Sequence, residues 1–332
     1  MPPIALTVGE PAGIGGEIAL KAWLARGSAV PPFYLLDDPE RVAGIARQLG
    51  WAVPVRAIAV PGEALSVFSA ALPVVPLDAA LRGSPGRPDP ADAPAIVGAI
   101  RRAVADVRAG RAAALVTNPI HKESLYRAGF AHPGHTEFLA ELSGLAGAPV
   151  MMLACPQLRV VPVTIHQALC DAIEALDTAK IVHAGRVAAA ALHRDFGIAR
   201  PVLAVAGLNP HAGEGGGLGR EEIDIVGPAV LELQQAGIDA RGPFAADTMF
   251  HPAARREYDA ALCMYHDQAL IPIKTIDFDG GVNVTLGLPF VRTSPDHGTA
   301  FAIAGKGIAR ADSLIAALRL AAELAARRRA AG

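Results

Sequence analysis

The chain has 332 residues and a formal net charge of −2, with 52% hydrophobic residues but only 5% aromatic ones. This length suits two α/β domains or one large one, and the aliphatic bias is typical of buried parallel strands covered by Ala-rich helices. The balanced charge argues against a nucleic-acid partner, since the only like-charged run is residues 327–329. No apolar run approaches the ~20 residues of a membrane span, and residues 1–4 lack a signal-peptide pattern. We expect a soluble, cytoplasmic protein without a membrane partner.

Short β-like runs alternate with stretches of helical period along the chain. Strands are expected at residues 4–8, 33–36, 112–116, 150–153, 160–165, 202–208, 260–265 and 282–286. Helices are expected at residues 14–25, 40–49, 95–109, 179–196, 221–236 and 313–327. This alternation predicts an α/β fold with a mostly parallel sheet, and the Pro- and Gly-rich segment 82–94 predicts a loop.

A Gly-rich turn, residues 9–16, follows the first predicted strand and precedes the first predicted helix. It lacks the third glycine of a dinucleotide-binding fingerprint, because Ile18 occupies that position, and no Gly-Lys-Ser/Thr follows. The spacing therefore favours a tight strand-to-helix turn that needs positive φ.

Three histidines share one context, because each ends or closely follows an apolar, strand-like run. They are His166, His211 and His266. Ligands of open α/β sheets bind beyond the carboxyl ends of strands, and three imidazoles there match a catalytic zinc-type site with one open position. Asp247 and Asp267 add carboxylates that are candidates for ligands or for partners of the histidines. The alternative at this point is three unrelated loop histidines that form local hydrogen bonds.

A second group of residues is suited to binding anions. His135 and Thr136 lie at an expected helix start, where Thr136 is a candidate N-cap and helix N-termini favour phosphate or carboxylate. Lys274, Asn283 and Arg292 lie in or beside strand-like segments, and the two cations would suit a phosphate. The alternative for isolated Lys and Arg residues is ordinary surface charge.

Seven strings, taken in order, resemble the 4-hydroxythreonine-4-phosphate dehydrogenase family. They are residues 9–15, 117–122, 134–137, 207–215, 264–268, 281–289 and 292–298, so the resemblance covers essentially the whole chain. It implies a two-domain fold like that of isocitrate and isopropylmalate dehydrogenases, with the active site in the interdomain cleft. Residues 1–118 with 293–332 would form the first domain, and residues 119–292 the second. It also implies a homodimer whose active site is shared between the subunits.

The resemblance further assigns roles to individual residues. His166, His211 and His266 would be the metal ligands, and His135, Thr136, Lys274, Asn283 and Arg292 would bind the substrate. The implied reaction oxidises 4-phosphohydroxy-L-threonine at C3 with NAD or NADP, followed by decarboxylation to 3-amino-2-oxopropyl phosphate for pyridoxal phosphate synthesis. Zinc is the expected metal, with magnesium or cobalt as alternatives. Lys274, Asp247 and Asp267 are candidates for proton transfer or for support of the ligands, and no cofactor contacts are assigned.

The pattern departs from the family at two places. Many relatives have Thr-Gly where this chain has Thr117-Asn118, and residues 167–169 after His166 also differ. Neither departure alters an assigned residue, but both are expected to tune which substrate fits. The nearest alternative is a 4-phosphoerythronate or 4-phosphothreonate dehydrogenase, which these motifs barely distinguish. From a different class, three histidines with an open position would also suit a metal-dependent phosphoesterase.

Overall fold

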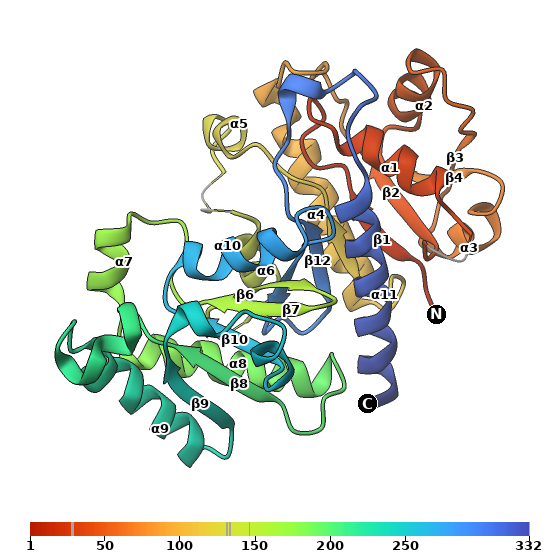
Figure 1. The fold of residues 1–332 in the computed structure, drawn as a ribbon. Helices are drawn as coiled ribbons and strands as arrows, with labels where there is room; N and C mark the ends of the chain where they lie inside the picture. Colours follow the sequence, from red (N-terminus) through yellow and green to blue (C-terminus); the bar gives the residue numbers. More distant parts are fainter. Residues whose placement is uncertain (28–29, 131, 133, 146, 332) are drawn as a thin grey trace. The chain divides into compact units, whose positions relative to one another are not determined.

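A computed structural model describes residues 1–27, 30–130, 132, 134–145 and 147–331. Its contacts divide the chain into two units. Unit 1 comprises Met1–Ala148 and Leu288–Arg329, and unit 2 consists mainly of Pro149–Gly287 (Figure 1). The boundaries expected from the sequence lay after residues 118 and 292. Residues 119–148 belong to unit 1 in the structure because Leu125, Phe138 and Leu139 are part of its hydrophobic core.

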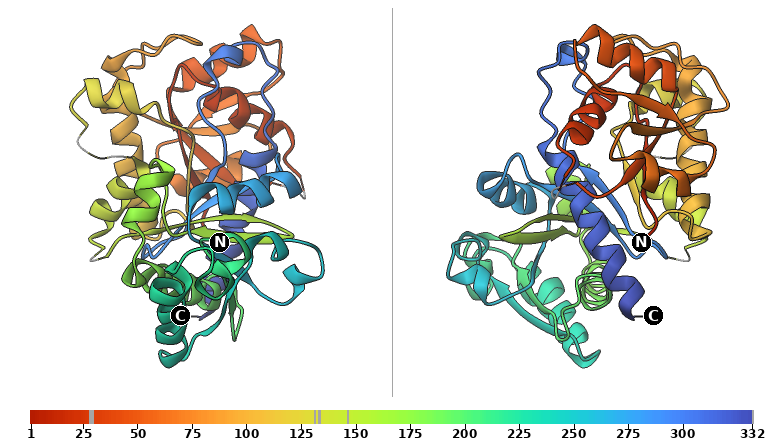
Figure 2. Two further views of the ribbon diagram at one scale, coloured as in Figure 1. Left: turned by 60° about the vertical axis from the view of Figure 1, so that its left-hand side comes forward. Right: turned by 90° about the vertical axis from the view of Figure 1, so that its right-hand side faces the viewer.

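Unit 1 contains a parallel sheet in the order β3-β4-β2-β1-β5-β12. Its strands are β1 (Ile4–Thr7), β2 (Phe33–Asp37), β3 (Val55–Ala57), β4 (Leu72–Pro76), β5 (Leu115–Thr117) and β12 (Arg292–Pro295). The helices are α1 (Gly15–Leu24), α2 (Pro39–Gln48), α3 (Ala64–Val67), α4 (Ala93–Arg108), α5 (Lys122–Arg127), α6 (His135–Ser143) and α11 (Asp312–Ala331). Helix α4 covers one side of this sheet, and α1 lies on the other (Figure 2).

Local sequence explains where these elements begin. Asp38 caps α2 by accepting hydrogen bonds from the backbone N–H groups of Glu40 at 2.9 Å and Arg41 at 3.5 Å, and Pro39 suits the first helical position. In α4 the apolar residues recur at helical spacing and pack into the core of unit 1.

Unit 2 contains a mixed sheet in the order β11-β6-β7-β10-β8-β9. Its strands are β6 (Val150–Cys155), β7 (Leu158–Pro162), β8 (Val202–Ala206), β9 (Asp239–Phe244), β10 (Ala260–Cys263) and β11 (Val282–Leu286). The β11–β6 and β6–β7 pairs are antiparallel, and the other pairs are parallel. The neighbouring strands β7, β10 and β8 therefore end at the same edge of the sheet.

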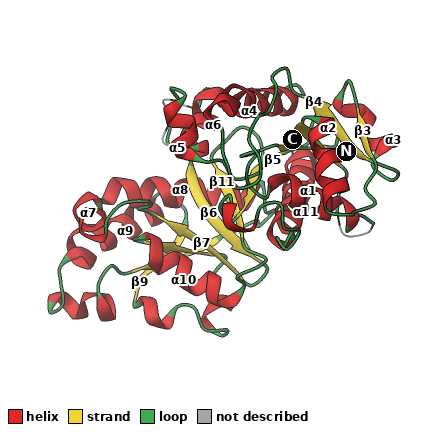
Figure 3. Cartoon of the chain, turned by 90° about the horizontal axis from the view of Figure 1, so that it is seen from above, coloured by secondary structure: helices red, strands yellow, loops and turns green. Residues whose placement is uncertain are grey.

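The helices of unit 2 cover both faces of its sheet. They are α7 (Leu169–Ala175), α8 (Thr178–Arg194), α9 (Gly227–Gln235) and α10 (His266–Ile276). Helices α8 and α9 lie on one side and α10 on the other (Figure 3). Asp177 caps α8 by accepting a 2.7 Å hydrogen bond from the backbone N–H of Lys180.

The structure confirms the predicted α/β fold with a mostly parallel sheet, and several elements differ in detail. The predicted helix at residues 221–236 is a π-helical turn, Glu222–Val226, followed by α9. Helix α10 was not predicted because Pro272 lies inside it, and β9 was not predicted because it contains Gly242 and Pro243. The loop at residues 82–94 contains a 3-10 turn, Pro90–Asp92. In the described part of the chain, no helix is both long and apolar enough to span a bilayer.

Candidate metal and anion sites

The three histidines predicted as metal ligands follow the three parallel strands that end together in unit 2. His166 follows β7, His266 is the first residue of α10 after β10, and His211 lies in the 3-10 turn Pro210–Gly216 after β8. The parallel order β7-β10-β8 accounts for this arrangement, because it brings the carboxyl ends of the three strands to one edge.

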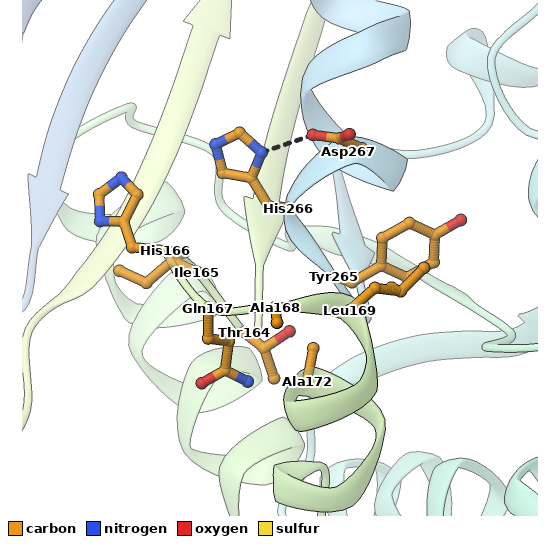
Figure 4. Close-up of a pocket in the computed structure, with 10 residues that line it drawn as sticks. All are labelled: Thr164, Ile165, His166, Gln167, Ala168, Leu169, Ala172, Tyr265, His266 and Asp267. Atoms are coloured by element: carbon orange, nitrogen blue, oxygen red, sulfur yellow. Dashed lines mark hydrogen bonds and ion pairs between the residues drawn. The ribbon is translucent and has the colours of Figure 1, made fainter.

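His166 and His266 form a pair at this edge. Their ring centroids are 5.9 Å apart and their ring planes are inclined by 44° (Figure 4). Two imidazoles bound to one zinc ion through Zn–N bonds of about 2.0–2.1 Å have centroids about 5–6 Å apart. The spacing of the pair therefore fits two ligands of one metal ion.

The carboxylate of Asp267 orients one member of this pair. Nδ1 of His266 lies 2.7 Å from Oδ1 of Asp267, and Figure 4 shows the His266 ring between Asp267 and His166. With Nδ1 engaged, Nε2 is the nitrogen left for a metal. A cavity of about 430 Å³ beside the pair is lined mainly by residues 164–169, Ala172 and residues 265–267.

His211 stands apart from the pair. Among the residues that the structure describes, no group of three or more His, Cys, Asp or Glu side chains lies close enough to hold a metal ion. The structure thus brings together two of the three predicted ligands. Asp247 lies in the 3-10 turn Ala246–Thr248, which contacts the turn that carries His211. Asp267 therefore contacts His266 directly, whereas Asp247 lies in a turn that packs against the turn of His211.

Two of the three predicted ligands have an unusual backbone conformation. His166 has φ of 42° and His211 has φ of 52°, and both lie in the left-handed region. For residues with a side chain this conformation costs roughly 1–2 kcal/mol, and it persists only where the surroundings enforce it. Such strain is concentrated at functional sites, which supports a role for these two loops.

The predicted substrate-binding residues are divided between the two units. Lys274 on α10 and Asn283 on β11 belong to unit 2, whereas His135 and Arg292 belong to unit 1. Nζ of Lys274 lies 5.4 Å from the centroid of the Phe278 ring. Asn283 is half-buried and pairs with Leu153 of β6.

In unit 1, His135 and Arg292 are part of a cationic cluster. Arg292 is 3% exposed, and its Nη2 donates a 2.6 Å hydrogen bond to Oγ1 of Thr117. Nε2 of His135 is buried without a hydrogen-bond partner among the described residues. Lys122 also lies here, because a Cβ built on Gly134 would be 3.6 Å from its Nζ. Lys122 ends one of the strings that carry the family resemblance, but the sequence indicated no role for it.

Burial and charge make this cluster receptive to an anion. Burial, followed by the positive charges of Arg292 and Lys122, holds the pKa of His135 well below its usual range. Burial also lowers the pKa of Arg292 to about 10, which leaves the guanidinium charged at neutral pH. An anion would compensate the buried positive charge and supply a partner for Nε2 of His135.

Thr136 does not cap helix α6 as the sequence predicted. Gly134 occupies the N-cap position, and Thr136 is the second residue of the helix. The helix therefore begins two residues earlier than expected, and the backbone of its N-cap residue Gly134 is extended, with φ of −178°. The side chain of Thr136 lies outside the described part of the structure.

The Gly-rich turn after β1 has the conformation that the sequence predicted. Gly9 has φ of +71°, and a Cβ on it would lie 2.6 Å from Cβ of Asn118 and 2.7 Å from the carbonyl oxygen of Pro119. Asn118, one of the departures from the family, donates a 3.0 Å hydrogen bond to the carbonyl of Thr7. Glu10 is 2% exposed and accepts a 3.1 Å hydrogen bond from the N–H of Ala12, and burial raises the pKa of its carboxyl group. Sequence analysis did not identify this buried acid.

Comparison with known proteins identifies the family. The family "Pyridoxal phosphate biosynthetic protein PdxA" matches residues 30–321. A 4-hydroxythreonine-4-phosphate dehydrogenase of Bradyrhizobium diazoefficiens is 57% identical to the chain, and the alignment covers 98% of this chain and 97% of the relative.

Solved structures agree with this result. The crystal structure of 4-hydroxythreonine-4-phosphate dehydrogenase from Klebsiella pneumoniae superposes with a TM-score of 0.86 at 38% identity, covering 98% of both chains. A terephthalate 1,2-cis-dihydrodiol dehydrogenase from Burkholderia xenovorans superposes with a TM-score of 0.64 at 31% identity, covering 97% of this chain and 98% of the other. The resemblance in the seven strings is thereby confirmed, and the chain belongs to the pyridoxal phosphate biosynthetic protein PdxA family of oxidoreductases.

Proposed function

We propose that the chain is a 4-hydroxythreonine-4-phosphate dehydrogenase of pyridoxal phosphate biosynthesis. It would oxidise 4-phosphohydroxy-L-threonine at C3 with NAD or NADP, and decarboxylation would yield 3-amino-2-oxopropyl phosphate. Similarity to dehydrogenases of this name over 98% of the chain supports the substrate. The structural observation that carries the proposal is the His166–His266 pair with Nδ1 of His266 held by Asp267. We also propose that the enzyme is cytoplasmic, as suits its small-molecule substrate.

The donor set of the pair suits a divalent metal. Imidazole nitrogens are common ligands of zinc and also suit cobalt, whereas magnesium prefers oxygen ligands. We therefore propose zinc first, with His166, His266 and His211 as the ligands. When bound, such an ion acts as a Lewis acid that lowers the pKa of a substrate hydroxyl group and polarises the ketone that forms. Asp267 would hold the tautomer of His266 that presents Nε2.

The cationic cluster of unit 1 would bind the phosphate group. Arg292 is held by its hydrogen bond to Thr117, so its guanidinium is preorganised, and His135 and Lys122 supply further polar contacts. Thr136, in the first turn of α6, is proposed to join them. This cluster would anchor the substrate and so align its C3 for oxidation.

Lys274 and Asn283 would bind the carboxylate and amino groups at the other end of the substrate. Lys274 is also the candidate for moving a proton during decarboxylation, because lysine is one of the side chains that act as general acids and bases. Asp247 would support the loop of His211. No residue is proposed for the contacts of the nicotinamide cofactor.

The proposal includes a homodimer in which each metal site draws ligands from both subunits. The resemblance to the family implies this arrangement, and the placement of the histidines in one chain is compatible with it. His166 and His266 are paired on one chain, so His211 is the ligand that the partner subunit would contribute. An isologous dimer would then create two equivalent sites.

The experiment that tests this function compares substrates with both cofactors. Purified protein is incubated with zinc and with 4-phosphohydroxythreonine, 4-phosphoerythronate or 4-phosphothreonate, and NADH or NADPH absorbance and inorganic phosphate are followed. The proposal expects reduced cofactor and CO2 with 4-phosphohydroxythreonine at the highest kcat/KM. A preference for a hydroxy acid would identify the alternative dehydrogenase, and phosphate release without reduced cofactor would identify a phosphoesterase. Either result would overturn the proposed function.

A further inference from the structure

We propose that Thr164 and Gln268 are positioning residues that set the spacing of the three histidine loops. This inference rests on the proposed metal site of His166, His211 and His266. Neither residue is among the predicted site residues, and neither needs to touch the metal. Their side chains connect the backbones of the three loops through the peptide groups of one residue, Met264.

Thr164 joins the loop of His166 to the loop of His266. It is 5% exposed and lies two positions before His166, and Met264 lies two positions before His266. Oγ1 of Thr164 donates a 2.8 Å hydrogen bond to the carbonyl oxygen of Met264, and the backbone N–H of Thr164 donates to the same oxygen at 3.3 Å. One buried carbonyl therefore holds the two chain segments that carry the histidine pair.

Gln268 joins the same point to the loop of His211. It is 8% exposed, and its Oε1 accepts a 2.7 Å hydrogen bond from the backbone N–H of Met264. Its Nε2 donates a 2.7 Å hydrogen bond to the carbonyl oxygen of Gly207, which follows β8 and opens the loop that carries His211. The two partners also establish the orientation of the amide, since one is a donor and the other an acceptor.

Gly207 itself is held firmly in place. Its N–H donates a 2.7 Å hydrogen bond to the carbonyl of Phe244, and a Cβ on Gly207 would lie 3.0 Å from Cα of Ala212. The same Cβ would lie 3.0 Å from Oε1 of Glu222. The backbone of Gly207 therefore lies close to Ala212, the neighbour of His211, with no room for a side chain between them.

Helix capping explains only part of this arrangement. Gln268 lies in the first turn of α10, so its bond to Met264 is of the kind by which a third helical residue caps the backbone before the helix. Capping does not require the bond from Nε2 to Gly207, which connects residues 61 positions apart. That second bond links two strand ends and makes Gln268 a bridge between loops.

The spacing of ligands determines metal affinity because a metal ion demands a narrow range of bond lengths and angles. Partners that orient ligands typically change metal affinity by about 10–100-fold when they are removed. The hydrogen bonds of Thr164 and Gln268 are suited to fixing the ligand spacing whether His211 completes the site of its own chain or that of a partner subunit. In both cases the loops must be held at fixed separations within each chain.

Gln268→Leu and Thr164→Val test the proposal, and each has a matched control in the same unit. Gln234→Leu removes a comparable 2.8 Å bond from Nε2 to the carbonyl of Ala240. Thr178→Val removes a 3.1 Å bond from Oγ1 to the carbonyl of Ile225. The full-length proteins are stripped of metal, and the zinc Kd is measured by competition with a chelator. The visible spectrum of the cobalt(II) form reports ligand geometry, and circular dichroism reports folding at the assay temperature.

The proposal expects Gln268→Leu and Thr164→Val to raise the zinc Kd by about 10–100-fold and to alter the cobalt spectrum. Gln234→Leu and Thr178→Val should leave both unchanged, and Thr164→Ser, which keeps the hydroxyl group, should restore the wild-type Kd. A zinc Kd for Thr164→Val equal to that of Thr178→Val would overturn the proposal, even if Gln268→Leu fails to fold. Zinc binding that persists in the His266→Ala variant would instead refute the proposed metal site, so the two failures are distinguishable.

Discussion

Nδ1 of His266 and Oδ1 of Asp267 are 2.7 Å apart, although the two residues are adjacent in the chain. His266 is the first residue of α10, and the start of the helix directs both side chains to the same side. This contact leaves the other ring nitrogen of His266 to face His166. In the proposed metal site, Asp267 would therefore determine which nitrogen of His266 binds the metal.

Replacement of this carboxylate should weaken metal binding without unfolding the protein. Asp267→Ala removes the acceptor that orients His266, and we expect the zinc Kd to rise about 10–100-fold. Because the Asp267 side chain is 68% exposed, its loss should alter the unfolding temperature little. Equilibrium dialysis with zinc measures the effect. Asp171→Ala, an exposed aspartate of α7, controls for the loss of a negative charge, and an equal change in both variants would contradict the assigned role.

Arg292→Ala should weaken the phosphorylated substrate far more than an analogue without phosphate. Loss of one partner of a buried, hydrogen-bonded charge pair costs about 2–5 kcal/mol, so kcat/KM for the phosphorylated substrate should fall by a factor of about 30 or more. The measurement is kcat/KM for 4-phosphohydroxythreonine and for 4-hydroxythreonine in wild type and variant. Equal losses for the two substrates would show that Arg292 does not contact the phosphate.

His135 should titrate differently in the presence of an anion. Burial and the charges of Arg292 and Lys122 lower its pKa. In the protein without an anion, the imidazole therefore stays neutral at pH values just below the usual histidine pKa of about 6.5. A bound phosphate would favour the imidazolium form and raise this pKa. NMR titration of the His135 ring with and without inorganic phosphate measures the change. A pKa that phosphate leaves unmoved would exclude His135 from the anion site.

The lowered pKa of His135 also predicts how the stability of the folded protein changes with pH. Because the folded-state pKa of His135 is depressed, the unfolded chain binds a proton as pH falls below about 6.5 while the folded chain does not. The stability of the folded state should therefore decrease from pH 6.5 downward, until the folded pKa is reached. The dependence should be weaker in His135→Gln, and urea unfolding at a series of pH values tests it. An unchanged dependence in the variant would contradict the depressed pKa.

Most of the described strands could be predicted from an apolar run or an apolar–polar alternation in the sequence, and so could the loops that follow them. Strand β11 has the predicted bounds, and the histidines after β7 and β10 lie together because parallel neighbours end at one edge. Helix α10 and strand β9 could not be predicted, since Pro272 and the Gly242–Pro243 pair interrupt the expected patterns.

Contacts between distant loops were beyond the reach of sequence patterns. The bridge from Gln268 to Gly207 depends on which strands are neighbours, and no local spacing reveals that order. Lys122 is another example. It follows a short strand and begins a short helix, as many surface lysines do, and only the fold brings it to Gly134 and His135.

Subunit complementation should reveal whether the site is shared. His166→Ala and His211→Ala proteins, each inactive alone, are refolded together. If His211 comes from the partner subunit, a mixed dimer contains one intact site, and random mixing restores about a quarter of wild-type activity. The matched control mixes His166→Ala with His266→Ala. Each site would take both of these residues from one chain, so each site of a mixed dimer would lack one ligand and no activity should return. Verified subunit exchange without recovery in the first mixture would rule out the shared site.

The metal dependence of the wild-type enzyme tests the central claim most directly. Protein stripped by a chelator and protein reloaded with zinc are assayed for NADH formation from 4-phosphohydroxythreonine, beside His166→Ala, His211→Ala and His266→Ala. His193→Ala, a surface variant in α8, is the control. We expect the stripped enzyme and the three site variants to remain folded but to be nearly inactive, because loss of one of three ligands disables such a site. Reloaded wild type should bind about one ion per chain and recover its activity. Full activity after exhaustive chelation would contradict the account.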